Sequence, residues 1–305
     1  MHPVLFTIGK FPVRAYGTLL VLGFLLALWR GVRVCQRRMQ TEPEGSPRRI
    51  HPDIAFDLGI FGLMFGVIGA RLMFVLLDWP SFAHNPLDIF KVWEGGLSLH
   101  GGLLFGILFL IFYCRWKKVS LLALGDLCAP SFAIAYAIGR VGCLLNGCCY
   151  GAPCSLPWAV RFPDESVHQP APPAAPILTA PSHPTQLYAT LFNLFFFVLL
   201  VRWEKRPRRD GEMFFGYIAL YGFYRFVVEM FRAGATSTYL IPSLHLTDTH
   251  IVSVLMVLAG LIGIGWLRRH RPAVADAEAP VPAAAATAVV TPLEPASLES
   301  ARRGK

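Results

Sequence analysis

Residues 54–77, IAFDLGIFGLMFGVIGARLMFVLL, form an apolar run of 24 residues that contains only two ionisable side chains, Asp57 and Arg71. A helix needs about 20 such residues to cross roughly 30 Å of hydrocarbon. Six further apolar runs lie at 16–35, 97–114, 121–139, 186–201, 213–231 and 249–267. The sequence therefore predicts an all-α integral membrane protein with about seven transmembrane helices.

The basic residues predict the orientation, because cytoplasmic loops of membrane proteins collect Lys and Arg. The connections 30–51, 115–118 and 202–209, together with the residues after 267, carry 20 of the 28 Lys and Arg. The N-terminus and the alternate connections carry 6. We therefore expect the N-terminus outside and the C-terminus in the cytoplasm. Topology accounts for most of the formal charge of +9, so we predict no nucleic-acid partner.

The membrane domain is expected to cover residues 1–270. Within it, residues 140–185 are predicted to form an external region, where nine prolines between 152 and 185 oppose regular structure. Residues 271–305 are rich in Ala and Pro and lack apolar periodicity. This composition predicts a disordered cytoplasmic tail.

Polar side chains inside the predicted spans indicate a functional site, since ionisable groups are costly there. With the orientation fixed, His100 lies about one turn below the outer surface. Tyr221, Arg225 and Glu229 are spaced i, i+4, i+8 and share one helix face near the outer end. Arg140 lies where the fourth run emerges. This convergence predicts a cationic pocket for an anionic headgroup, which is completed by Tyr16 and Arg71.

Each of these residues also has a purely structural alternative. Arg225 and Glu229 could be an ion pair within the fold, and the arginines of the second and fourth runs could extend to lipid headgroups. Gly101 and Gly102 could admit a neighbouring helix. Tyr16 could be an interfacial anchor.

Residues 139–151, GRVGCLLNGCCYG, are the most specific string. Four more follow a fixed order around it: Tyr16-Gly17, WEGGLSLHGG at 93–102, HPTQLY at 183–188, and Tyr221-x3-Arg225-x3-Glu229-x2-Arg232. The five strings, at matching topological positions, resemble those of the prolipoprotein diacylglyceryl transferase family. The resemblance spans about residues 5–267.

The resemblance implies an enzyme of the bacterial plasma (inner) membrane whose active site faces outward. Such a transferase moves the diacylglyceryl group of phosphatidylglycerol onto the lipobox cysteine of a preprolipoprotein signal peptide, leaving a thioether and releasing glycerol phosphate. Its partners would be this phospholipid, the signal peptide and membrane lipids, with no cofactor or metal. The candidate residues are, for catalysis, His100, Arg140, Tyr221, Arg225 and Glu229, and for substrate binding, Tyr16, Arg71, Gly101, Gly102, Arg140, Asn146, Gly151 and Tyr188.

Elementary chemistry gives these residues distinct roles. A free thiol near pKa 8.5 is mostly protonated at neutral pH, and its thiolate is the nucleophile. His100 could take that proton. Arg140 and Arg225 could bind the departing phosphate as bidentate donors. Glu229 would then orient Arg225, and Tyr221 would add a hydroxyl donor.

Four positions depart from the family pattern. Cys143 and Cys148 stand where Asn and Glu are common, Ala189 where Glu is common, and His250 where Gln is usual. They leave open a divergent paralogue with another acceptor, and a lipid transporter is a further alternative. The group of Cys143, Cys148, Cys149 and Cys154 could form a disulfide, bind a metal or stay as free thiols.

Overall fold

The computed structural model describes residues 3–9, 11–83, 85–92, 95–164, 177–206, 209–232, 240–241 and 246–270. The predicted tail, 271–305, lies outside these described residues. Seven long helices account for most of the rest: α1 (Ala15–Thr41), α2 (Pro52–Leu77), α4 (Leu99–Lys117), α5 (Leu121–Asn146), α6 (Thr185–Trp203), α7 (Glu212–Glu229) and α8 (Asp248–His270). Each one begins and ends within a few residues of a predicted apolar run, except that α1 and α5 extend further at their C-terminal ends.

Six of these helices are long and apolar enough to cross a membrane, as the predicted integral membrane protein requires. The exception is α7, whose 18 residues include Glu212, Arg225 and Glu229. The outward faces of the helices carry large apolar side chains: Leu108 is 55% exposed, Leu255 59% and Ile262 69%. Such faces are compatible with lipid tails, and the helices satisfy their backbone polar groups internally.

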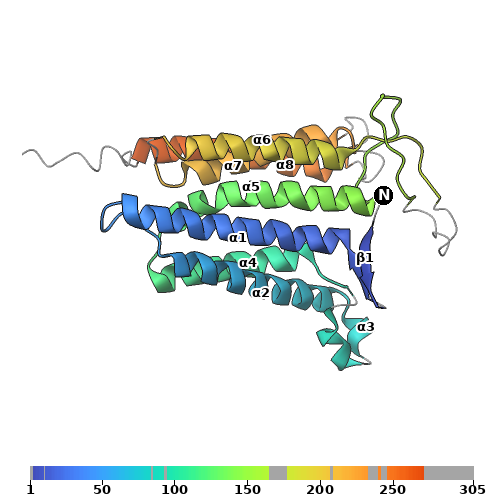
Figure 1. The fold of residues 1–305 in the computed structure, drawn as a ribbon, viewed down its shortest axis with the longest axis horizontal. Coiled ribbons are helices and arrows are strands. Elements are labelled where there is room, and N and C mark those ends of the chain that lie inside the picture. The colour runs from blue at the N-terminus through green and yellow to red at the C-terminus, as the bar shows by residue number, and fades with distance from the viewer. Residues whose placement is uncertain are drawn as a thin grey trace, which may run out of the picture.

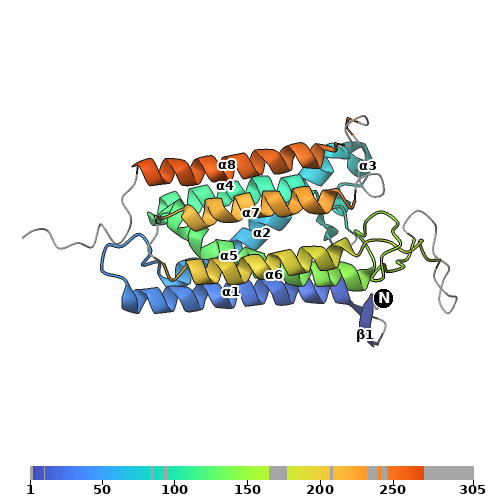
Figure 2. The ribbon, with the colours of Figure 1, turned by 90° about the horizontal axis from the view of Figure 1, so that it is seen from above.

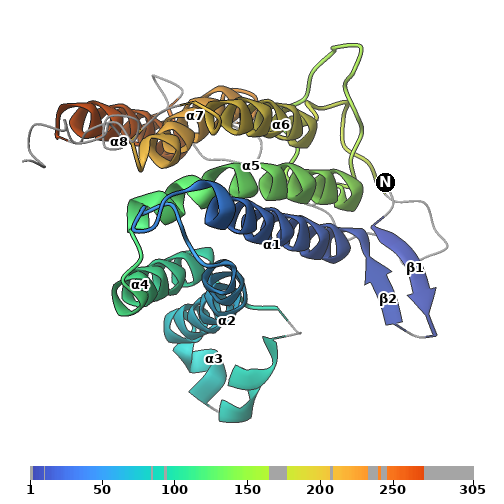
Figure 3. The same cartoon turned by 60° about the vertical axis from the view of Figure 1, so that its left-hand side comes forward.

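The helices form three groups that run along one common direction. α1, α5 and α6 lie side by side, α7 packs on α8, and α2 packs on α4. Figure 3 shows the α2–α4 pair standing off from the rest, to which α2 is joined mainly through α1. Seen from above, the same helices remain nearly parallel or antiparallel (Figure 2).

Glycines permit the close approach of α2 and α4. A Cβ at Gly101 would overlap the carbonyl oxygen of Gly69 and the Cβ of Met73. A Cβ at Gly102 would lie 3.2 Å from the carbonyl oxygen of Gly66. Since lipid tails are as apolar as the helices, tight packing of small residues is what favours association in a bilayer.

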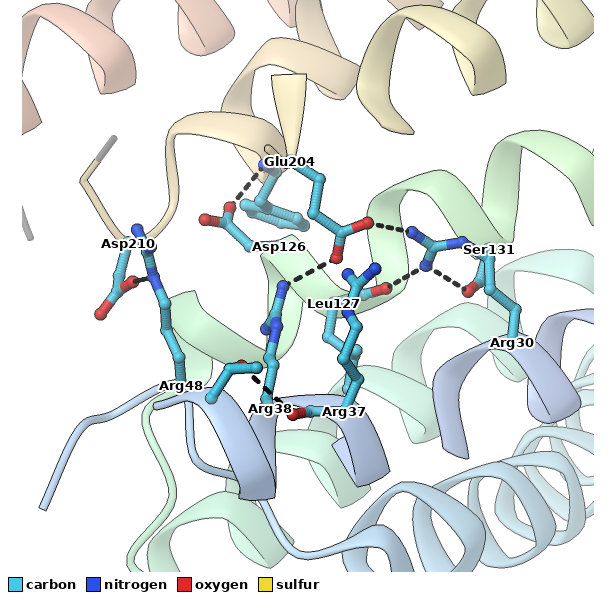
Figure 4. A network of polar contacts seen from close by, with 11 residues as sticks. Arg30, Arg37, Arg38, Arg48, Asp126, Leu127, Ser131, Glu204 and Asp210 are labelled. Atoms are coloured by element: carbon cyan, nitrogen blue, oxygen red, sulfur yellow. Dashed lines mark hydrogen bonds and ion pairs between the residues drawn. The ribbon is translucent and has the colours of Figure 1, made fainter. Parts of the chain in front are cut away.

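An ionic network joins α1, α5 and α6 toward the end of the bundle opposite the N-terminus (Figure 4). Glu204 accepts from Arg30 at 2.6 Å and from Arg38 at 2.8 Å, one bond to each carboxylate oxygen. Arg30 also donates to the carbonyl oxygen of Leu127 at 3.2 Å. A cavity of about 310 Å³ borders this network. All of it lies away from the predicted site.

Four short elements were not predicted. Strands β1 (Val4–Ile8) and β2 (Phe11–Arg14) form an antiparallel hairpin before α1, with Gly9 at φ 61° in its turn. Between α2 and α4 the chain forms α3 (Trp79–Ala83) and the 3-10 helix η1 (Pro86–Phe90). The hairpin is a departure from the all-α prediction. Its strands are too short to produce a periodic signal of their own.

Candidate functional site

The predicted site residues all lie toward one end of the bundle. Successive long helices run in opposite directions, so the starts of α1, α4, α6 and α8 and the ends of α2, α5 and α7 meet there. Figure 1 shows this end at the right, with the β hairpin, α3 and the loop after α5. The convergence predicted from depth alone is therefore present at the level of helix ends.

The loop after α5 folds back over the last turn of that helix. Gly147 at φ 82° and Cys149 at φ 65° both adopt the left-handed backbone conformation. The amides of Gly147 and Cys148 donate to the carbonyl oxygen of Cys143 at 2.9 and 3.1 Å. From the start of α6, Gln186 donates to the carbonyl oxygen of Cys148 at 2.7 Å and Thr185 to that of Cys149 at 2.9 Å. The string 139–151 is thus a fixed structure.

Arg140 belongs to a cluster of tyrosines from α5 and α7. Its Nε donates to the hydroxyl of Tyr136 at 2.9 Å, and that hydroxyl lies 3.1 Å from the hydroxyl of Tyr224. The ring of Tyr221 packs edge-on against that of Tyr136, with centroids 5.6 Å apart. No carboxylate pairs with Arg140 among the described residues. The hydrogen bonds of its guanidinium among these residues go to the neutral hydroxyl of Tyr136.

Arg225 and Glu229 form the predicted pair, with Nη1 and Oε2 2.9 Å apart. The contact is ionic rather than an aligned hydrogen bond, and Nη1 has no aligned acceptor among the described residues. Glu229 is fully buried and accepts from the hydroxyl of Thr247 at 3.2 Å. That hydroxyl lies 3.0 Å from Nδ1 of His250, at the start of α8. A chain of contacts thus runs from α8 to the Arg225 guanidinium.

Arg71 is engaged with backbone. Its guanidinium donates to the carbonyl oxygens of Asp88, Ile89, Gly95 and Gly96 at 2.6 to 3.0 Å. These four bonds hold the segment between α2 and α4 in place. They occupy N–H groups of the guanidinium that would otherwise be able to bind a phosphate. Arg71 therefore positions this loop, and its direct contact with substrate remains a prediction.

His100 is exposed near the start of α4, and the described residues offer it no hydrogen-bond partner. It stands on the α2–α4 pair, whereas Arg140 and Arg225 belong to α5 and α7. Gly101 and Gly102, which follow it, face α2 and serve helix packing. The structure therefore brings Arg140, Tyr221, Arg225 and Glu229 together, and it leaves His100 on a separate helix pair at the same end.

The remaining candidates border the loop after α5. Tyr16 is 40% exposed, and its Cα lies 3.3 Å from where a Cβ at Gly142 would be. The amide of Gly151 donates to the carbonyl oxygen of His183 at 2.9 Å, and a Cβ there would overlap the carbonyl oxygen of Phe231. Tyr188 accepts from Nε1 of Trp158 at 2.8 Å.

Asn146 ends α5 and lies beside the thiol of Cys148. Tyr188 also lies 3.2 Å from Nδ1 of His183 through its hydroxyl. Burial lowers the pKa of His183 below its usual value. The first contact lies within the turn that ends α5, and the second holds the residues before α6 against that helix.

Of the four cysteines between residues 143 and 154, three lie together and one lies apart. The Sγ atoms of Cys143, Cys148 and Cys149 lie within 4.8 Å of one another, and Cys154 lies outside this group. All seven thiols of the chain are unpaired. A four-thiolate arrangement is therefore not formed.

Two functional neighbours were missed by the sequence analysis. Tyr136 lies four residues before Arg140 on the same helix, so the i, i+4 spacing could have revealed it. Thr247 directly precedes α8, and its hydroxyl donates to Glu229 of α7. No spacing in the sequence indicates that contact.

Comparison with known proteins agrees with these motifs. A family profile described as prolipoprotein diacylglyceryl transferase matches residues 3–266. Relatives named phosphatidylglycerol–prolipoprotein diacylglyceryl transferase include one from Parasynechococcus marenigrum (strain WH8102), 33% identical over 88% of this chain and 95% of the relative. One from Geobacter sulfurreducens is 36% identical over 76% and 82%. One from Staphylococcus aureus (strain bovine RF122 / ET3-1) is 32% identical over 88% and 90%.

These matches cover nearly every helix that forms the site. The chain is a helical membrane protein with a cationic, tyrosine-lined cluster at one end of its bundle. It belongs to the prolipoprotein diacylglyceryl transferase family.

Proposed function

We propose that this chain transfers the diacylglyceryl group of phosphatidylglycerol to the thiol of the lipobox cysteine in preprolipoproteins. The observation that carries the proposal is the Arg140 guanidinium, held by a tyrosine hydroxyl and facing no carboxylate among the described residues. A guanidinium left in this state suits an anionic group such as the phosphate of a lipid. The names of the relatives support the same substrates.

The reaction forms one bond and breaks one. The thiol sulfur of the acceptor attacks the glyceryl carbon that carries the phosphate ester, and the carbon–oxygen bond to phosphate breaks. Glycerol phosphate leaves with the electron pair, and a thioether remains. The thiol proton goes first to a base and then to solvent.

His100 is the proposed base. Its exposure leaves the imidazole accessible, and the described residues do not occupy its nitrogens. Because it stands on the α2–α4 pair, the acceptor peptide and the lipid would meet between this pair and the helices that carry the arginines. Electrostatic stabilisation of the departing phosphate by Arg140 and Arg225 would supply much of the rate enhancement in a site of low dielectric.

Glu229, Thr247 and His250 position Arg225. Glu229 is buried and bridges Arg225 to the Thr247 hydroxyl, which in turn contacts His250. The positive charge of Arg225 is thus partly compensated by a carboxylate on its own helix. Tyr221 adds a hydroxyl at the same place.

The proposal includes a topology. α7 also spans the membrane and is the sixth of seven spans in chain order, with its three charges at its two ends. Residues 1–270 form one membrane domain. The N-terminus and the loop after α5 face outward in the plasma (inner) membrane, and the C-terminus faces the cytoplasm. In a background without native cysteines, a cysteine at Leu156 should react with an impermeant reagent from outside and one at Lys118 only from inside. Labelling of both from one side would reject this orientation.

The decisive test is mass spectrometry of a model preprolipoprotein. Membranes depleted of endogenous transferase should leave the substrate unmodified, and expression of this chain should restore the diacylglyceryl mass. An Arg140→Gln variant that accumulates to the same level is the matched control and should not restore it. Unmodified prolipoprotein in the presence of the folded chain would reject the proposal.

A different acceptor is the second candidate, favoured by one observation. Two of the positions that depart from the family pattern, Cys148 and His250, lie in or beside the site. If phosphatidylglycerol were consumed while the prolipoprotein stayed unmodified, this alternative would replace the first.

A further inference from the structure

Three thiols meet where α5 ends and its following loop turns back. Cys143 lies in the last turn of α5, and Cys148 and Cys149 follow the turn at Gly147. Their Sγ atoms all lie within 4.8 Å of one another. None of the roles proposed above for the transferase uses these thiols.

The backbone around the thiols is fixed by bonds that come from outside the cluster. The carbonyl oxygens of Cys148 and Cys149 accept from Gln186 and Thr185 of α6, at 2.7 and 2.9 Å. Cys149 adopts a left-handed conformation, with φ 65°, that is unfavourable for a non-glycine residue. Strain of this kind persists where the surrounding structure imposes it, and it is concentrated at functional sites.

Thiolates are soft ligands that select Cu(I), zinc and iron–sulfur clusters. With metal–sulfur bonds near 2.3 Å, three sulfurs around one ion stand about 4 Å apart. The sulfurs here would need to move by less than about 1 Å to reach that arrangement. A disulfide would instead bring two of the sulfurs to about 2.05 Å and leave the third thiol without a partner.

We propose that Cys143, Cys148 and Cys149 form a trigonal site for one Cu(I) ion. The group contains no fourth His, Cys, Asp or Glu ligand within the part of the chain that the structure describes. Structural zinc is almost always bound by four ligands. A site with three thiols therefore suits Cu(I), a soft ion that accepts three thiolate ligands, better than it suits zinc. Binding forms three copper–sulfur bonds and releases three thiol protons to solvent, with no change of oxidation state.

The charges nearby favour an anionic complex. Three thiolates and one Cu(I) carry a net charge of −2. The Arg140 guanidinium lies within electrostatic range of Cys143 and Cys149, and Arg232 lies within range of Cys149. These cations compensate the complex, whereas they would oppose an ion held by neutral ligands. Arg140 is also the proposed ligand of the lipid phosphate, so the copper complex would share its charge with the substrate, and metal binding is therefore measured without lipid or peptide.

The test is a Cu(I) titration of the purified full-length chain in detergent, in competition with the chelator bathocuproine disulfonate. We expect one Cu(I) per chain, with X-ray absorption reporting three sulfur neighbours near 2.3 Å. Cys149→Gly is the key variant, since glycine accepts the left-handed backbone and keeps the loop intact. It should weaken Cu(I) binding by at least about 100-fold. Cys154→Ser, which removes a thiol outside the group, should bind as the wild type does.

Two results would overturn the site. One is Cu(I) binding by Cys149→Gly that equals that of the wild type, because the ion would then be held elsewhere. The other is a disulfide between two of the three cysteines in protein isolated without reductant, accompanied by failure to take up Cu(I) after reduction. Either outcome would leave the proposed transferase function untouched, and loss of transferase activity would not by itself affect the copper site.

Discussion

Gly101→Ala tests whether the glycines after His100 serve helix packing or substrate binding. The added methyl group would overlap the carbonyl oxygen of Gly69 and the Cβ of Met73. The obstructing atoms include helix backbone, so they cannot turn aside as a flexible side chain can. Ordinary contact requires about 3.5 Å, so α2 and α4 would have to separate by roughly 1 Å.

The expected loss combines two opposing terms. Alanine is favoured over glycine in a helix by about 1 kcal/mol. Overpacking at a tight contact costs about 1–3 kcal/mol, so the net effect on stability is between roughly 0 and 2 kcal/mol of destabilisation. The effect on activity is larger, since a 1 Å displacement of a group next to the chemistry can cost about 100-fold in rate. His100 directly precedes Gly101 and would move with it.

The assay is the rate of prolipoprotein modification, measured with thermal unfolding of the same detergent-purified samples. Gly106→Ala is the matched control on the same helix, because nothing lies within 4 Å of its added Cβ. Gly102→Ala should fall between the two, with its nearest contacts at 3.2 and 3.4 Å. The reasoning fails if Gly101→Ala and Gly106→Ala have equal activity. Unchanged stability with weakened lipid binding alone would instead assign Gly101 to the substrate.

Arg225→Lys should keep the charge but lose the bidentate fork, leaving weak residual modification of the prolipoprotein, with Arg225→Ala far lower and Glu229→Gln between them. Equal rates for the lysine and alanine variants would reject a role for the charge. His100→Gln should abolish turnover near neutral pH, retain phosphatidylglycerol binding, and recover partly at higher pH as the acceptor thiol ionises. A variant that is inactive at every pH and fails to bind lipid would remove His100 as the base. Glu204→Gln should lower the melting temperature by leaving two buried guanidinium groups underneutralised, at a cost of about 3–5 kcal/mol, while activity per folded molecule is kept. An unchanged melting temperature would show that the network contributes nothing to stability. Burial lowers the pKa of His183 in the folded state, so its stabilising contribution is present above about pH 6.5 and is lost as the pH falls below it; His183→Gln should weaken the fall in melting temperature between pH 7 and 5. An identical pH profile in the variant would contradict this sign.

Helix positions were predictable because lipid imposes a minimum apolar length on every span. The fourth run illustrates where this rule stops. It was predicted to end at residue 139, yet α5 continues to Asn146. The added turns contain Arg140 and Gly142, which lower the mean hydropathy and are typical of a loop. In the structure, however, Gly142 lies in the helix at the point where α5 approaches Tyr16 of α1. A polar helix end inside a site cannot be distinguished from a loop by composition.

The depth of the site residues was also predictable, since a rise of 1.5 Å per residue places each one along its own helix. Their partners were not. Tyr224 reaches Tyr136, and Thr247 reaches Glu229, only because of the order in which α5, α7 and α8 pack. Arg71 lies at the predicted end of α2, and carbonyl oxygens of the chain between α2 and α4 accept four bonds from its guanidinium, which no spacing in the sequence indicated. Its contact with substrate stays a prediction.

Arg140 differs in its partners from the buried arginines at the opposite end of the bundle, and the contrast supports the assignment of the site. Toward one end, the carboxylate of Glu204 pairs with both Arg30 and Arg38, so that a side chain of the protein itself compensates their positive charge. At the other end, Arg140 is bonded to a tyrosine hydroxyl and has no carboxylate among its described neighbours. An uncompensated cation at low dielectric costs several kcal/mol, and a helix bundle gains no packing from it that a methionine would not provide. Arg140 lies at the end of the bundle where all five motifs meet. Its presence there is explained if the phosphate of the bound lipid supplies the negative charge that pairs with its guanidinium.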